Sequence, residues 1–189
     1  MAFAAFSIAI GAIWSMHFAG MNALTLQTPA GDHIDVSFNV VYTLLSLVAA
    51  FVCVYAGLYI STRDSFFTLE KGKIIEMFLK SPGAFQKIKD RRYMLMTMLL
   101  RGLGGIVLGG VVAAGGVCIM HYVGMMAMVC DCKMEWDGGL VFLSVLIAMI
   151  AGSAAFWILF RLLALYPQLE ILRVLSAVVM MVAVMSMHY

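Results

Sequence analysis

Long uncharged stretches constrain the fold of this chain more than any other feature. Asp, Glu, Lys and Arg are absent from five segments: Ala2 to Leu26, Val36 to Thr62, Gly102 to Cys130, Gly138 to Phe160 and Val174 to Tyr189. The first four exceed the ~20 residues that a transmembrane helix needs, and the fifth reaches that length if Glu170 to Arg173 lies at the membrane interface. The sequence therefore predicts five transmembrane helices.

The fold class follows from the length of these segments. The bilayer core offers no water, so each span must satisfy its backbone hydrogen bonds internally, and spans of this length are helices rather than barrel strands of ~10 residues. The composition agrees, with 64% hydrophobic and 12% charged residues. We therefore expect an all-α integral membrane protein. The segment "RGLGGIVLGGVVAAGG" predicts close helix packing through Gly105 and Gly109 rather than a phosphate-binding loop.

The distribution of basic residues predicts the orientation. Nine of the twelve Lys and Arg residues lie in the loop at 63–101, two flank the turn after the fourth helix, and only Lys133 lies on the opposite side. The positive-inside rule places the basic loops in the cytoplasm. We therefore expect the protein in a plasma or inner membrane. Apolar residues are mixed with basic ones in the long loop, which predicts that it contacts anionic lipid headgroups. The alternative is that its charges only fix the orientation of the helices in the membrane. The net charge of +2 hides this uneven distribution and says nothing about nucleic acid, which we do not expect as a partner.

A Met-His-aromatic motif recurs in three of the predicted helices, as "WSMHFAGM", "CIMHYVGM" and "MSMHY". In the predicted topology His17, His121 and His188 lie at similar depth towards the outer face. The helices between the motifs also match, because "LSLVAAFVCVYAGLY" from Leu45 aligns with "LSVLIAMIAGSAAFW" from Leu143. The repeating unit is therefore a helix pair, and we expect a bundle built from repeated pairs.

Ionisable side chains within a membrane span indicate a functional site, because their burial must be offset by pairing or by use. Residues three or four apart on a helix share a face, so each motif helix offers one imidazole and one thioether to the same side. These candidate ligands are His17, Met21, His121, Met125, His188 and Met185. Thioether and imidazole together suit Cu(I) better than calcium, magnesium or zinc. The sequence predicts a copper site near the outer leaflet.

The methionine that precedes each motif histidine is a weaker candidate. Met16, Met120 and Met187 point about 100° away from the neighbouring histidine around the helix. Methionine is also a flexible filler of helical cores, and the chain contains 17 of them. These three residues are therefore either secondary ligands or packing residues.

Three cysteines are accessory candidates. Cys118 lies one turn before His121 on the same helix face. Cys130 and Cys132 form a Cys-Asp-Cys sequence in a predicted outer loop, where they either pass a metal towards the helices or are oxidised to disulfides. Each histidine likewise has an alternative role, as a polar core residue hydrogen-bonded to a neighbouring helix.

The repeated motif and the intervening Leu-Ser helices resemble the MHYT domain, a sensory membrane domain named for its Met-His-Tyr-Thr sequence. The resemblance extends over most of residues 1–189. It implies sensing of a diatomic gas (O2, CO or NO), or of redox state, through copper held by the Met and His residues of the motif, with Tyr also implicated. Only Tyr122 and Tyr189 can serve as that Tyr, because Phe18 replaces the first one, and no Thr follows in any copy.

The resemblance also implies a partial domain. The family normally has a helix before the first motif and further chain after the third, whereas this sequence begins in what resembles the second helix and ends within a motif. Cytoplasmic output regions, such as cyclic-di-GMP enzymes or kinases, would be partners outside this chain. The sequence contains no catalytic constellation, and we do not expect an enzyme.

Three other functions stay open at this point. A haem-bearing electron carrier would use two histidines as axial ligands and show a strong Soret band. A metal transporter would use the Met and His residues as a transient path and would be recognised by uptake into vesicles. A structural bundle without a ligand predicts that His→Ala changes alter stability alone.

Overall fold

Most of the chain is helical in a computed structural model that describes residues 1–27, 32–63, 99–100, 103–130, 135–162 and 170–185. The first helix is continuous from α1 through the π-helical segment η1 into α2, and η3 extends α7 in the same way. The helical elements are α1 (Ala2–Phe6), η1 (Ser7–Trp14), α2 (Ser15–Ala23), α3 (Val40–Thr62), α6 (Leu103–Met126), α7 (Gly138–Trp157), η3 (Ile158–Leu162) and α9 (Glu170–Met185).

Four helices within the described part of the chain are long and apolar enough to cross a membrane. They are Ala2–Ala23, Val40–Thr62, Leu103–Met126 and Gly138–Leu162. They coincide with the first four uncharged stretches. The fifth predicted span is helical over the 16 residues of α9, and residues 186–189 lie outside the described residues. Five spans therefore stay a prediction. Most of the basic loop at 63–101, with its expected headgroup contact, also lies outside the described residues.

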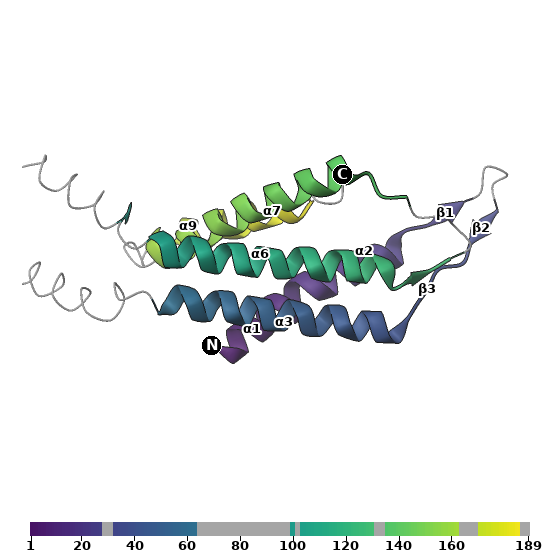
Figure 1. The fold of residues 1–189 in the computed structure, drawn as a ribbon, viewed down its shortest axis with the longest axis horizontal. Coiled ribbons are helices and arrows are strands. Elements are labelled where there is room, and N and C mark those ends of the chain that lie inside the picture. The colour runs from purple at the N-terminus through teal and green to yellow at the C-terminus, as the bar shows by residue number, and fades with distance from the viewer. Residues whose placement is uncertain (28–31, 64–98, 101–102, 131–134, 163–169, 186–189) are drawn as a thin grey trace, which may run out of the picture.

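Short antiparallel ladders join the helices at one end of the bundle, which we call the strand end (Figure 1). The paired strands are β1 (Leu26–Gln27) with β2 (His33–Ile34), and β3 (Ser37–Phe38) with β4 (Met128–Val129). Beside the second ladder, the Asn39 N–H donates to the Ala127 carbonyl oxygen at 2.8 Å. The chain is mostly helical, as expected, but these short ladders were not predicted. They form because backbone groups outside a helix need other partners and find them across the loops.

Helices α3 and α7 begin at the strand end with the same kind of cap. Asn39 Oδ1 accepts hydrogen bonds from the backbone N–H groups two and three residues further on, at 2.9 and 3.4 Å. Asp137 Oδ1 accepts the equivalent pair at 2.7 and 3.2 Å. Such caps satisfy backbone donors that the first turn of a helix leaves unpaired. The two caps stand at the same offset before Ser46 and Ser144, the serines of the matching Leu-Ser segments.

Helix α6 packs between α3 and α7. A Cβ at Gly109 would collide with Ser61 and lie 2.5 Å from the carbonyl oxygen of Gly57 on α3. On the α7 side, a Cβ at Gly110 would lie 2.7 Å from the Cα of Ser153. Lipid gives helices no hydrophobic reason to associate, so small residues that allow close backbone contact hold them together. The predicted packing role of the glycine-rich segment is confirmed at Gly109.

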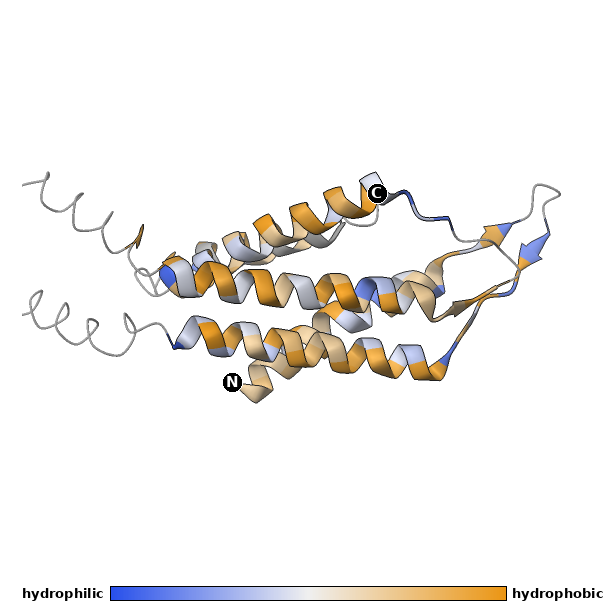
Figure 2. Cartoon of the chain, viewed as in Figure 1, coloured by the Kyte–Doolittle hydropathy of each residue, from blue (hydrophilic) through white to orange (hydrophobic). Residues whose placement is uncertain are grey.

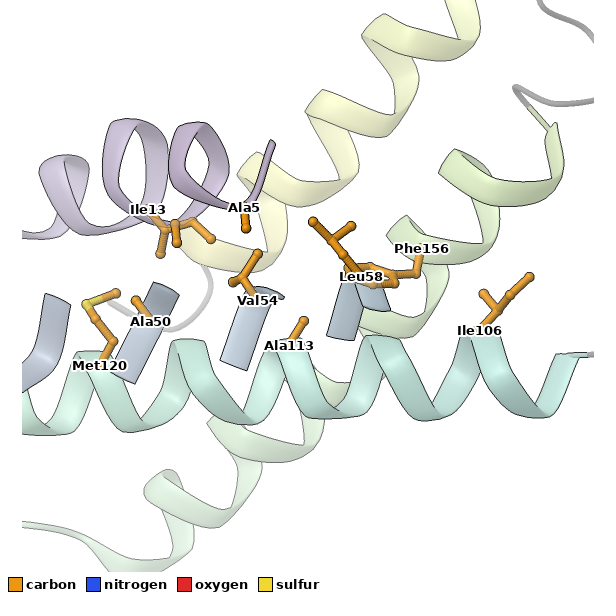
Figure 3. Packing of buried hydrophobic residues seen from close by; sticks show 10 residues of the cluster. Ala5, Ile13, Ala50, Val54, Leu58, Ile106, Ala113, Met120 and Phe156 are labelled. Carbon is orange, nitrogen blue, oxygen red and sulfur yellow. The ribbon is translucent and has the colours of Figure 1, made fainter. Parts of the chain in front are cut away.

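The buried hydrophobic cluster lies mainly where the first helix, α3 and α6 meet (Figure 3). Its members include Ala5, Ile13, Ala50, Val54, Leu58, Ile106, Ala113, Met120 and Phe156. Many other large apolar side chains point outwards, among them Phe142, which is 71% exposed. Figure 2 shows hydrophobic residues along the helices and hydrophilic ones at the strand end and at the start of α7. This is the pattern of a bundle whose outer surface faces lipid.

We expect Gly109→Ala to destabilise the bundle and Gly115→Ala to leave it intact. Gly115 lies on the same helix, and a Cβ there would meet nothing within 4 Å. Overpacking at Gly109 should lower the free energy of unfolding by about 1–3 kcal/mol. Reversible unfolding in detergent, followed by circular dichroism, measures both values. Equal effects of the two substitutions would show that α3 and α6 do not approach each other at Gly109.

Candidate functional site

The structure brings two of the motif histidines into contact. The ring centroids of His17 on α2 and His121 on α6 lie 5.0 Å apart, with an interplanar angle of 72°. Both side chains are buried, at 1% and 7% exposure. Sequence reasoning placed the motif histidines at similar depth, and the structure adds that these two meet edge to face. The third, His188, lies outside the described residues.

Each histidine continues a buried face of its own helix. On α2, His17 shares the buried face with Met21, one turn further on, as the spacing predicts. On α6, His121 and Cys118 are buried, and they extend the stripe that contacts α7 through Gly110. The π-helical segment η1 ends at Trp14, one turn before His17. Segments of this kind frequently occur at functional sites.

The backbone of α6 forms one wall of the site. A Cβ at Gly124 would lie 2.5 Å from Nε2 of His17, so only glycine leaves room for this imidazole. Sequence reasoning gave Gly124 no role. A signal was nevertheless present, because glycine follows the histidine by three residues in both complete motif copies, as Gly20 and Gly124.

Aromatic rings cover the site towards the strand end. The ring of Phe18 contacts His17 edge-on at a centroid distance of 5.2 Å. Phe38, in β3, contacts Phe18 in turn at 5.7 Å. The β3–β4 ladder thereby places an apolar side chain against Phe18, which itself contacts His17. Sequence reasoning did not find Phe38, because its position depends on a strand pairing between two distant loops.

The predicted methionine ligands fall into two groups. Met21 is buried and Met125 is half-buried, each one turn after its histidine. Met120 packs in the hydrophobic cluster, and Met16 is 41% exposed. The weaker ligand role expected of these two methionines stays a prediction. Met187 lies outside the described residues.

Tyr122 directs its hydroxyl towards α7. The hydroxyl lies 2.6 Å from Ser144 Oγ, and the ring contacts Trp136 at a centroid distance of 5.4 Å. The ring also contacts that of His121 at 5.0 Å. Tyr122 is therefore adjacent to the histidine pair while its oxygen is engaged elsewhere. Tyr189 lies outside the described residues.

The accessory cysteines differ in state. Cys118 is a free, buried thiol on the His121 face of α6. Cys130 is disulfide-bonded, so its sulfur is not a thiolate ligand in this form of the protein. Cys132 lies outside the described residues. Of the two roles open to the Cys-Asp-Cys sequence, the state of Cys130 favours oxidation.

The arrangement limits the metals that the pair can hold. Within the described ranges, no group of three or more His, Cys, Asp or Glu residues is placed to hold a metal ion. A structural zinc site normally has four ligands from Cys and His. The described His, Cys, Asp and Glu residues therefore do not make such a zinc site.

Comparison with known proteins identifies related sequences. The family model MHYT, described as "Bacterial signalling protein N terminal repeat", matches this chain twice, over residues 11–70 and 115–172. The bifunctional diguanylate cyclase/cyclic di-GMP phosphodiesterase MucR of Pseudomonas aeruginosa is 31% identical over 185 residues. The alignment covers 98% of this chain and 21% of MucR. No solved structure matches this chain.

We expect Gly124→Ala to push the two imidazoles apart. Non-bonded carbon contacts are favourable at ~3.5–4.0 Å, so a Cβ at this position requires the His17 ring to move by about 1 Å. Solid-state NMR of metal-free protein with labelled histidines, in lipid bilayers, should show a weaker contact between the two rings. Gly20→Ala is the matched control, since a Cβ there meets nothing within 4 Å. An unchanged ring contact in Gly124→Ala would contradict this packing.

Proposed function

Because the chain belongs to the MHYT family of bacterial signalling proteins, we propose that it is a membrane sensory domain that binds copper at the histidine pair and responds to a diatomic gas or to redox state. The observation that carries the proposal is the buried contact between His17 and His121. Two motif copies far apart in sequence each contribute one imidazole to it.

The burial of His17 and His121 supports a ligand-binding role for them. A polar group buried in an apolar environment has a free-energy cost that a partner or a ligand must offset. Ionisable side chains within membrane spans are therefore rare and usually functional. Four apolar helices and the family assignment make this chain an integral membrane protein. Two imidazoles at one place in such a bundle indicate a ligand-binding role more strongly than a packing role.

The donor set fits copper. His17 and His121 would bind as neutral imidazoles, and Met21, buried on the same face as His17, would add a soft thioether. Met125 stands in the equivalent position on α6. Phe18 and Phe38 would keep water from the strand end out of the site. Copper, when bound, would supply a redox-active centre able to take a diatomic gas as a further ligand.

Direct ring contact disfavours a haem held between His17 and His121. Axial histidines lie on opposite faces of a porphyrin and are separated by it, whereas these imidazoles touch edge to face. The metal-transporter alternative is consistent with the same donors. It differs in requiring passage of the ion across the membrane, which uptake into vesicles would reveal.

The output is proposed to lie outside these residues. MucR is named for cyclase and phosphodiesterase activities, and this chain spans 21% of its length. We place those activities in the remainder of such a protein and a sensory, non-catalytic role in this domain. A ligand at the pair would bias the contact between α2 and α6, which is effective only if two packing states differ in affinity for it. The basic residue distribution orients the site towards the outer face.

Copper analysis of detergent-purified protein tests this proposal. We expect near-stoichiometric copper in the wild type after loading and its loss from His17→Ala/His121→Ala. His33→Ala is the control, because His33 is exposed in β2. An absorption spectrum of the same sample would reveal haem through a Soret band. A wild type without copper, or a double variant that retains it, would contradict the proposal.

A further inference from the structure

Two serines make equivalent pairs of hydrogen bonds on the two Leu-Ser helices. On α3, Ser46 Oγ donates to the Thr43 carbonyl oxygen at 2.7 Å and accepts from Nε1–H of Trp14 at 3.2 Å. On α7, Ser144 Oγ donates to the Val141 carbonyl oxygen at 2.8 Å. Its second partner is the Tyr122 hydroxyl, at 2.6 Å. Both serines thus bond to their own helix and to an aromatic side chain of the preceding motif helix.

Donor and acceptor in these bonds follow from the number of protons that each group can donate. A serine hydroxyl has one proton, and Ser144 directs it to Val141. Tyr122 therefore donates to Ser144, just as the indole of Trp14, which can only donate, does to Ser46. Each serine is an acceptor fixed in place by its own helix. A donor that reaches it must approach along one of the two lone pairs of its oxygen.

The two donors are close to the two histidines in the chain. Trp14 lies one turn before His17, and Tyr122 directly follows His121. Successive residues of a helix are about 100° apart, so a helix rotation that broke either bond would also swing the histidine away from its present direction. Ser46 is fully buried, and no water in the bilayer core could replace a lost bond there.

We infer that Trp14–Ser46 and Tyr122–Ser144 are positioning pairs that set the rotation of the two motif helices and thereby bring His17 and His121 together. The inference rests on the proposed function only in calling that pair a metal site. It assigns Tyr122 to positioning rather than to metal ligation. It also accounts for the first motif copy, in which Phe18 has no hydroxyl and Trp14 supplies the donor.

The test compares Tyr122→Phe, Ser144→Ala and the double variant. If the residues act through one shared bond, each single change should weaken copper affinity about tenfold. The double variant should be no weaker than either single variant, because both remove the same interaction. Ser153→Ala is the matched control, since Ser153 also donates to a carbonyl oxygen of its own helix, that of Met149, and lies on α7 at the Gly110 contact. Ser144→Thr keeps the hydroxyl and should restore the wild-type affinity.

A spectroscopic readout separates positioning from ligation. If Tyr122 were a ligand, Tyr122→Phe would change the electron paramagnetic resonance spectrum of the Cu(II) form while Ser144→Ala left it unchanged. Positioning predicts that the two variants give the same altered spectrum. A spectrum that changes in Tyr122→Phe but not in Ser144→Ala would overturn the assignment.

The ring contact in metal-free protein gives a second readout, independent of copper. Solid-state NMR in bilayers should show a weaker contact between His17 and His121 in Tyr122→Phe and in Ser144→Ala, but not in Ser153→Ala. This ring-contact test applies even if the wild type binds no copper. The absence of copper would contradict the proposed function but not the positioning role. An undisturbed ring contact in both folded variants, verified by circular dichroism, would overturn the positioning role.

Discussion

The structure depends on the absence of water from the bilayer core. Every backbone N–H and C=O within a span must be paired inside that span, and a helix satisfies this locally. The same lack of water removes the hydrophobic reason for helices to associate, so association depends on close contact. Gly109 and Gly110 provide this contact on two sides of α6, which is why α6 can pack against both α3 and α7. The remaining elements are arranged around this core.

The absence of water from the bilayer core also gives polar side chains a large influence on how the helices pack. A hydroxyl or indole N–H in an apolar bundle needs a partner, and the partner must lie in a particular direction. Ser46 and Ser144 each meet this need with one bond to their own helix and one to a motif helix. Few such bonds suffice to select one rotation for each helix. These bonds act together with the glycine contacts of α6 in setting the rotation of the helices that carry the histidine pair.

The site also connects the first motif helix to α6 and to the β3–β4 ladder. His17 lies against Gly124 of α6, while Phe38 links the first motif helix to the β3–β4 ladder that extends from the end of α6. The contact between Asn39 and Ala127 connects the same loops. A ligand that changed the separation of the two imidazoles would therefore act on α6, which extends to the opposite end of the bundle (Figure 1). This arrangement suits the sensory role proposed for the domain.

The sequence by itself determined the positions of four apolar helices and singled out the histidines and methionines that are proposed as ligands. Helix formation in a membrane is local, so the length of an uncharged stretch and the spacing from His17 to Met21 were sufficient. Only the tertiary structure decided that His17 meets His121, that Gly124 leaves room for the imidazole, and that Tyr122 bonds to Ser144. The β-ladders were missed for the same reason. Which faces and loops meet depends on packing between segments far apart in the chain, and periodicity within one helix carries no information about its partner.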